Sequence, residues 1–173
     1  MYSAHDPDGI DRFFRGLTEH AFHTRLGVVD PPLIDYVSLL LVRFIRNDRI
    51  RSLPSAGSAE INDVARMLSI VEEAPATVAR EKYQHIGDST LFWSGLYPEA
   101  LKQFRYSSRH AHLLNRDSLI DWRAVGKQAY WIASTLEPEA ASRERRLLEQ
   151  LSQEFDLCVE GLSEVRRAWA EPA

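Results

Sequence analysis

The sequence predicts an all-α protein: an irregular helical bundle of five to six main helices with a long C-terminal helix, in a single domain over residues 1–173. Three observations predict it. Apolar residues recur at three- and four-residue spacing through most of the chain, and no segment alternates apolar and polar residues over a useful length. The length of 173 residues and the 45% hydrophobic content suffice for one domain with a sizeable core.

The first helices are delimited by turn-forming residues. A helix is expected from about residue 9 to 25, ending before Gly27, because glycine readily takes the left-handed conformation that follows a helix. Asp30 then reads as an N-cap and Pro31 as the first helical residue, where the missing N–H costs nothing. Apolar residues surround most of this second helix, so we expect it to be the central helix of the core.

The middle of the chain predicts further helices on similar signals. Ser58 can cap a helix that reaches about residue 73, and Pro75 precedes one that extends to residue 94 or 95. Pro98 opens a short helix, and a longer one is expected from about residue 117 to 136.

The C-terminal segment carries the most regular pattern. An uninterrupted heptad seam predicts one helix from about residue 140 to 169, which would span about 45 Å. Such a helix can brace the whole bundle. Its length and seam also indicate a homodimer in which two copies pair through this helix. The seam consists of Leu148, Leu151, Phe155, Cys158, Leu162, Val165 and Trp169.

Composition excludes several classes of partner. A formal net charge of -4 gives no general attraction to nucleic acid or to an anionic membrane. The mostly apolar run of residues 37–42, broken by Ser38, is far shorter than the ~20 residues of a membrane span, and the N-terminus lacks the regions of a secretion signal. The single cysteine, Cys158, excludes an intramolecular disulfide and fits a reducing compartment. We therefore expect a cytoplasmic protein.

A polar cluster interrupts the helical pattern in the segment "HIGDSTLFWSGLYPE", residues 85–99. His85 and Asp88 are three residues apart and therefore neighbours on one helix face. A carboxylate beside an imidazole fixes the tautomer and raises its basicity, as a general base or an oriented metal ligand requires. The same residues can instead form a helix interior that satisfies its own polar groups. Both interpretations stay open.

A second polar pair, of two histidines, suggests where further metal ligands could come from. His20 and His23 are also three residues apart, close enough to share a metal ion. Helical bundles build carboxylate–histidine sites from facing helices. One hypothesis is that His20, His23, His85 and Asp88 meet across two helices and hold zinc or iron. Whether such a site would be catalytic is left open.

A basic segment offers a third class of function. Between residues 102 and 116 the chain has no acidic residue, and Phe104 and Tyr106 add rings that can stack on bases. This pattern suits a phosphate ligand or single-stranded nucleic acid. The acidic net charge weighs against a dedicated nucleic-acid binder. The candidate ligand-binding residues are Lys102, Arg105, Arg109 and Arg116.

The 85–99 segment, followed by "FDLCVEGL" from Phe155, resembles a family of uncharacterised bacterial all-helical proteins with no assigned activity. The resemblance implies a bacterial source and an all-α fold, and it supplies no catalytic residue. The hydrolase, phosphate-loop and zinc-protease motifs are absent from the sequence. The leading hypothesis is therefore an interaction or scaffold module. It rests on the seam and on four tryptophans, of which Trp169 is expected to be exposed in a monomer.

Overall fold

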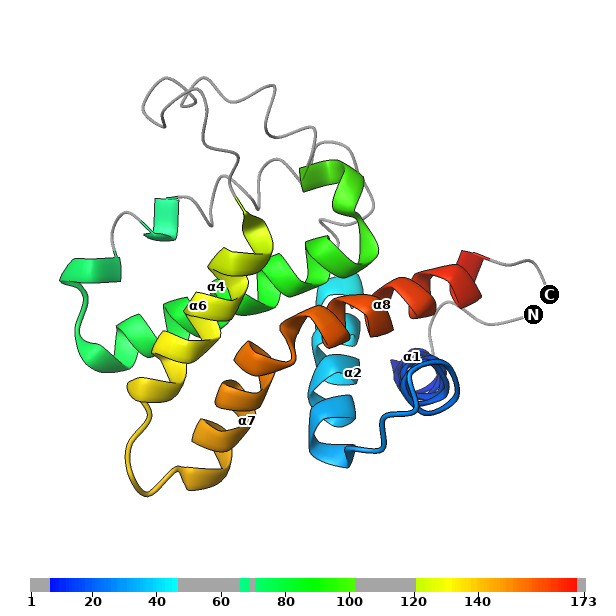
Figure 1. Ribbon diagram of the computed structural model, residues 1–173, viewed down its shortest axis with the longest axis horizontal. Helices are drawn as coiled ribbons and strands as arrows, with labels where there is room; N and C mark the ends of the chain where they lie inside the picture. The colour runs from blue at the N-terminus through cyan, green and yellow to red at the C-terminus, as the bar shows by residue number, and fades with distance from the viewer. Residues whose placement is uncertain (1–6, 47–65, 69–70, 102–120, 171–173) are drawn as a thin grey trace.

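The computed structural model describes residues 7–46, 66–68, 71–101 and 121–170. Within these ranges the chain forms helices and turns without a strand, which confirms the all-α class (Figure 1). No helix in the described part is long and apolar enough to cross a membrane. The helix predicted from Ser58 to about residue 73 falls mostly outside the described ranges. Its described part is helical at residues 66–68, and a 3-10 turn, Val71–Glu73, lies at its expected end.

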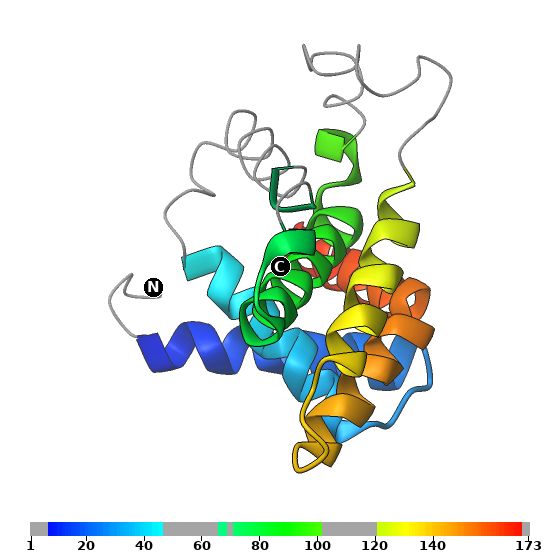
Figure 2. The same ribbon diagram turned by 90° about the vertical axis from the view of Figure 1, so that its left-hand side faces the viewer.

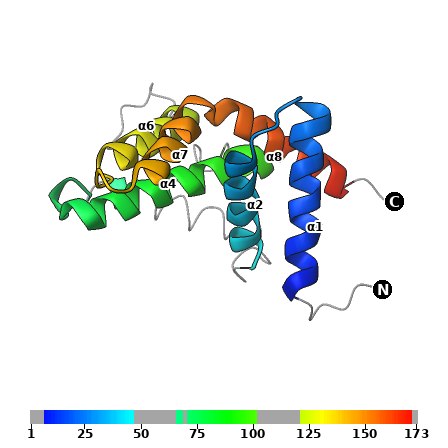
Figure 3. The same ribbon diagram turned by 90° about the horizontal axis from the view of Figure 1, so that it is seen from below.

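The first two helices form a pair that lies side by side (Figure 3). Helix α1, Pro7–His20, continues into a π-helical turn, Ala21–Arg25, and Gly27 ends the element with a φ of 66°, as predicted. Helix α2, Pro31–Arg46, begins as expected, with the Asp30 carboxylate accepting a hydrogen bond from the Leu33 N–H at 3.2 Å. The π-turn itself has no signal in the sequence.

Helix α4, Ala76–Leu96, is the central helix of the core. Every residue from 86 to 96 is buried, because α2, α6 and α8 all pack against it. In Figure 2 this green helix lies between the cyan α2 and the yellow α6. The expectation that the helix after Asp30 is central is wrong: α2 leaves Leu39 57% exposed and directs its charged residues to solvent.

Helix α6, Trp122–Thr135, packs closely against α4. Asp121 caps it by accepting a hydrogen bond from the Ala124 N–H at 3.1 Å. Gly126 permits the close approach, because a Cβ there would lie 2.5 Å from the Thr90 hydroxyl and 2.4 Å from the Phe155 ring. The short helix predicted at Pro98 occupies residues 98–101.

The long C-terminal helix is divided into two. Helix α7, Ser142–Gln153, ends at Glu154, and α8, Phe155–Ala170, leaves in a different direction (Figure 1). The prediction of one straight helix is therefore wrong, although the seam itself lies in the core. Its first six residues, from Leu148 to Val165, are at most 3% exposed, whereas Trp169 is 41% exposed. The seam thus supplies the bundle's own core, with α7 packed on α6 and α8 packed on α4.

Candidate functional site

The polar cluster predicted on α4 converges on the carboxylate of Asp88, which is 2% exposed. Its Oδ1 accepts hydrogen bonds from the hydroxyl groups of Tyr36 at 2.6 Å and Tyr130 at 2.7 Å. Its Oδ2 accepts a hydrogen bond from the Arg43 guanidinium at 2.6 Å. Three helices, α2, α4 and α6, are joined at this one side chain. We call Asp88, Tyr36, Tyr130 and Arg43 the Asp88 cluster.

The environment of the Asp88 cluster keeps both phenols protonated. Burial, followed by the negative charge of Asp88, raises the pKa of Tyr36 and that of Tyr130 well above the ordinary tyrosine value. The Gln84 amide adds a hydrogen bond to the Tyr36 hydroxyl oxygen at 3.0 Å. A buried carboxylate is costly unless its oxygens accept hydrogen bonds. The cluster meets that requirement with groups of its own chain.

Packing as well as hydrogen bonding holds the Asp88 cluster. A Cβ at Gly87 would lie 2.7 Å from the Tyr130 ring, so the ring lies directly on the α4 backbone. Arg43 is the part that reaches solvent, with 54% of its side chain exposed. The arrangement is a polar connection between helices that is exposed to water at the guanidinium and, to a smaller extent, at the half-buried Tyr36.

His85 is separate from the Asp88 cluster in its contacts. Its side chain is exposed, and its ring lies nearly parallel to that of Phe44, with centroids 6.5 Å apart. The Ser89 hydroxyl oxygen lies 3.5 Å from the His85 Nε2 atom. The predicted His85–Asp88 pair therefore shares a helix, but Asp88 is engaged by two tyrosines and an arginine.

The other predicted metal ligands belong to a different part of the fold. His20 ends α1 and His23 lies in the π-turn, and both are exposed beside α8. Among the residues that the structure describes, no three His, Cys, Asp or Glu side chains are grouped to hold a metal ion. The zinc or iron site thus stays a prediction. The predicted basic residues Lys102, Arg105, Arg109 and Arg116 lie outside the described residues.

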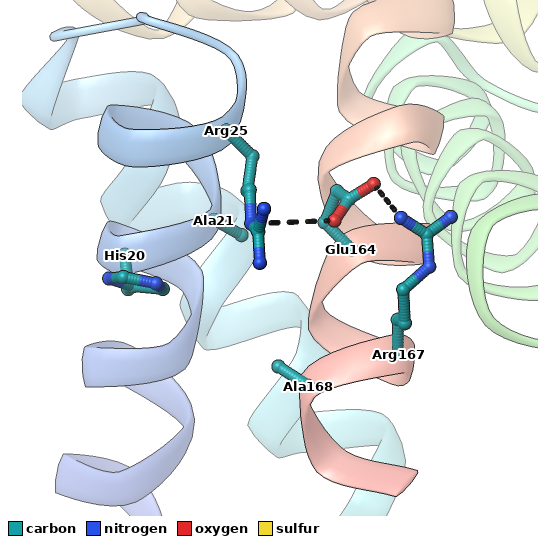
Figure 4. A pocket seen from close by; sticks show the side chains of 6 residues that line it. All are labelled: His20, Ala21, Arg25, Glu164, Arg167 and Ala168. Carbon is teal, nitrogen blue, oxygen red and sulfur yellow. Dashed lines mark hydrogen bonds and ion pairs between the residues drawn. The ribbon is translucent and has the colours of Figure 1, made fainter. Parts of the chain in front are cut away.

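A shallow hollow separates α1 from α8 (Figure 4). It measures about 30 Å³, which is room for a few water molecules rather than for a metabolite. Glu164 lies at its centre and pairs with Arg167 at 2.6 Å and, more loosely, with Arg25 at 4.0 Å. The hollow is completed by His20, Ala21 and Ala168.

Next to this hollow, aromatic rings form a continuous surface that we call the aromatic edge: Phe13, Phe14 and Trp169. The Phe14 ring contacts both others, with centroid distances of 5.1 Å and edge-to-face geometry. Phe14 is 5% exposed, whereas Phe13 is 43% and Trp169 is 41% exposed. Ile10, 36% exposed, lies one turn before them on α1. The two outer rings are therefore anchored on a buried ring and are partly exposed to solvent.

Comparisons with protein-family models, with curated proteins and with solved structures gave no significant match for the chain. The resemblance to a bacterial helical family is therefore untested. Functional inference rests on the geometry alone.

Sequence reasoning identified Asp88 but missed its partners. Tyr36 and Arg43 are seven residues apart on α2 and so share a face, which is a signal that the sequence contains. Tyr130 comes from a helix 42 residues after Asp88, and periodicity alone does not pair helices.

Proposed function

We propose that this protein is an interaction module that binds a protein partner through the aromatic edge. The observation that carries the proposal is the run of three touching rings whose outer members, Phe13 and Trp169, are each about two-fifths exposed. Isolated exposed apolar residues are ordinary on protein surfaces. Clustered aromatic rings differ, because they supply large rigid contact area at low cost in conformational entropy and dominate binding at protein interfaces.

The contacts of the Asp88 cluster support a structural role for the polar segment of residues 85–99. Both oxygens of the carboxylate accept hydrogen bonds from tyrosine and arginine side chains of neighbouring helices. A buried and satisfied polar network of this kind fixes the relative positions of the helices that it joins. It thus holds the scaffold that displays the aromatic edge.

Of the C-terminal helix that was predicted to bind a partner, only the end of α8 is included in this proposal. Because six of the seven seam residues are buried within the chain, Trp169 is the seam residue that α8 offers to a partner. The proposal includes a cytosolic location and a bacterial source. Burial raises the pKa of the Cys158 thiol to about 12, which suits a cysteine that is structural and reduced.

Site-specific photocross-linking tests the proposal. Benzoylphenylalanine is incorporated at position 169 or 13 of the full chain, and cells that make the protein are irradiated. The matched control places the same group at position 131, because Trp131 is 49% exposed on α6. We expect a discrete cross-linked species from positions 13 and 169 and none from 131. Equal cross-linking from all three positions, or none from any, contradicts the proposal.

A further inference from the structure

The outward face of α1 continues the aromatic edge. Gly9, Phe13, Gly16 and His20 follow one another at spacings of four, three and four, the spacing of the two seam positions in a coiled coil. Phe13 and His20 are exposed, and a Cβ at Gly16 would meet no atom of the neighbouring described residues within 4 Å. The opposite face of α1 carries the buried Phe14 and Thr18. This helix therefore packs on its own core with one face and carries on another an alternating seam of rings and glycines, in which Phe13, Gly16 and His20 are exposed and Gly9 is half-buried.

The alternation is self-complementary only when two such helices run antiparallel. In that arrangement, Phe13 of one copy lies opposite Gly16 of the other, and His20 lies opposite Gly9. A two-fold axis makes every such contact occur twice. Each ring thus meets a position without a side chain. In a parallel pair, by contrast, Phe13 would oppose Phe13 and Gly16 would oppose Gly16.

The residues that flank this seam follow the same rule. In an antiparallel pair each flank meets the same flank of the other copy. On one side the exposed residues Arg12 and Glu19 are seven residues apart, so Arg12 of each copy faces Glu19 of the other. On the other side lie two apolar residues, Ile10, which is 36% exposed, and the half-buried Leu17. Charge complementarity and apolar contact therefore favour the same register.

We infer that the partner at the aromatic edge is a second copy of this chain, bound by antiparallel pairing of α1. The inference rests on the proposed function and gives its partner. The seam spans two heptads, fewer than the three to four of an independent coiled coil. A reversible dimer is therefore expected, rather than an obligate one.

Sedimentation velocity of the full chain, from low micromolar to near-millimolar concentration, tests the dimer. Phe13→Ala removes the ring, and Gly16→Leu fills the position opposite it; each is expected to weaken dimerisation at least about tenfold, or roughly 1.4 kcal/mol. Gly16→Leu is informative because leucine favours the helix and should leave the monomer folded. Circular dichroism verifies this. Trp131→Ala is the control, expected to leave the dissociation constant unchanged.

A charge swap tests the antiparallel register. Arg12→Glu or Glu19→Arg alone places like charges opposite each other and is expected to weaken the dimer several-fold. The double variant carrying both changes is expected to restore it, because the pair is then reversed in both copies. Failure of the double variant to recover, or an unaltered dimer in Gly16→Leu, overturns the antiparallel pairing.

The outcomes for this inference and for the proposed function are distinguishable. A protein that remains monomeric at every concentration overturns the second-copy inference, whatever its cross-links show. If positions 13 and 169 then cross-link to a different protein, the aromatic edge still functions as an interaction surface. If they cross-link to nothing, both fail.

Discussion

Removal of the Tyr130 hydroxyl group is the sharpest test of the Asp88 cluster. Tyr130→Phe deletes one of the two phenol hydrogen bonds to Asp88 Oδ1 and retains the buried ring. A hydrogen bond to a buried charged group contributes about 1.5–3 kcal/mol, so the free energy of unfolding is expected to fall by that amount. The Tyr36 hydroxyl still donates a hydrogen bond to the same carboxylate oxygen at 2.6 Å, so the helices should stay in place.

The effect of this substitution depends on Asp88. Asp88→Ala leaves two hydroxyl groups without their acceptor and is expected to cost about 2–6 kcal/mol, at about 1–3 kcal/mol for each unsatisfied donor. Loss of the Arg43 ion pair adds little, because the guanidinium is 54% exposed and screened by water. In the Asp88→Ala background the Tyr130 hydroxyl is an orphaned donor, so its removal should be neutral or stabilising. The coupling between the two changes is therefore expected to be about 1.5–3 kcal/mol.

Urea unfolding followed by far-ultraviolet circular dichroism measures the four proteins of this double-mutant cycle. Tyr83→Phe, a half-buried tyrosine of the same α4 that does not donate to Asp88, is the matched control. We expect it to change stability by less than about 0.5 kcal/mol. Equal costs of Tyr130→Phe in the wild-type and Asp88→Ala backgrounds would refute the network.

Three further predictions concern burial. The pKa of Tyr36 and that of Tyr130 are raised in the folded state, so above about pH 10 the unfolded chain loses these protons first. The free energy of unfolding should then fall by about 1.4 kcal/mol per pH unit for each group. The urea midpoint of Tyr36→Phe should fall less steeply with pH than that of the wild type. Cys158, fully buried with a pKa raised to about 12, should resist thiol reagents in the native protein and react at once in urea; rapid native labelling would contradict its placement. Gly126→Ala should destabilise the fold by about 1–3 kcal/mol through its clash with Phe155 and Thr90, whereas Gly16→Ala, measured at low concentration, should stabilise α1 by up to about 1 kcal/mol.

Local signals were enough to predict most helix boundaries. Gly27, Asp30 and Pro75 act within a few residues of themselves, through a positive φ, a side-chain cap and a blocked N–H, and the helices begin or end where these residues stand. The break at Glu154 has no such signal, because the heptad pattern runs through it without glycine or proline. Packing of α7 on α6 and of α8 on α4 sets different directions for the two halves, and this is information from distant parts of the chain.

The central helix was misjudged for a related reason. Asp88, Ser89 and Thr90 make α4 look half polar, so its sequence suggests a surface helix. Each is at most 2% exposed. The Thr90 hydroxyl donates to the Ile86 carbonyl one turn before it, while Asp88 is satisfied by residues 42 to 52 positions away along the chain. A hydrophobicity pattern assigns polar side chains to the surface. Only the fold shows which of them are buried with hydrogen-bond partners.

The enclosure of residues 86–96, the second half of α4, also constrains how the chain can fold during synthesis. The helices that cover α4 come from both sides of it in the sequence: α2 precedes it, and α6 and α8 follow. The Gly95 backbone is covered by Leu162, about 70 residues later. A nascent chain that has released α4 can cover Phe92 with Phe44 of α2, whereas Gly95 lacks its Leu162 cover until α8 leaves the ribosome. Chains interrupted before that point carry an incompletely covered core helix, the kind of surface that aggregates or engages chaperones.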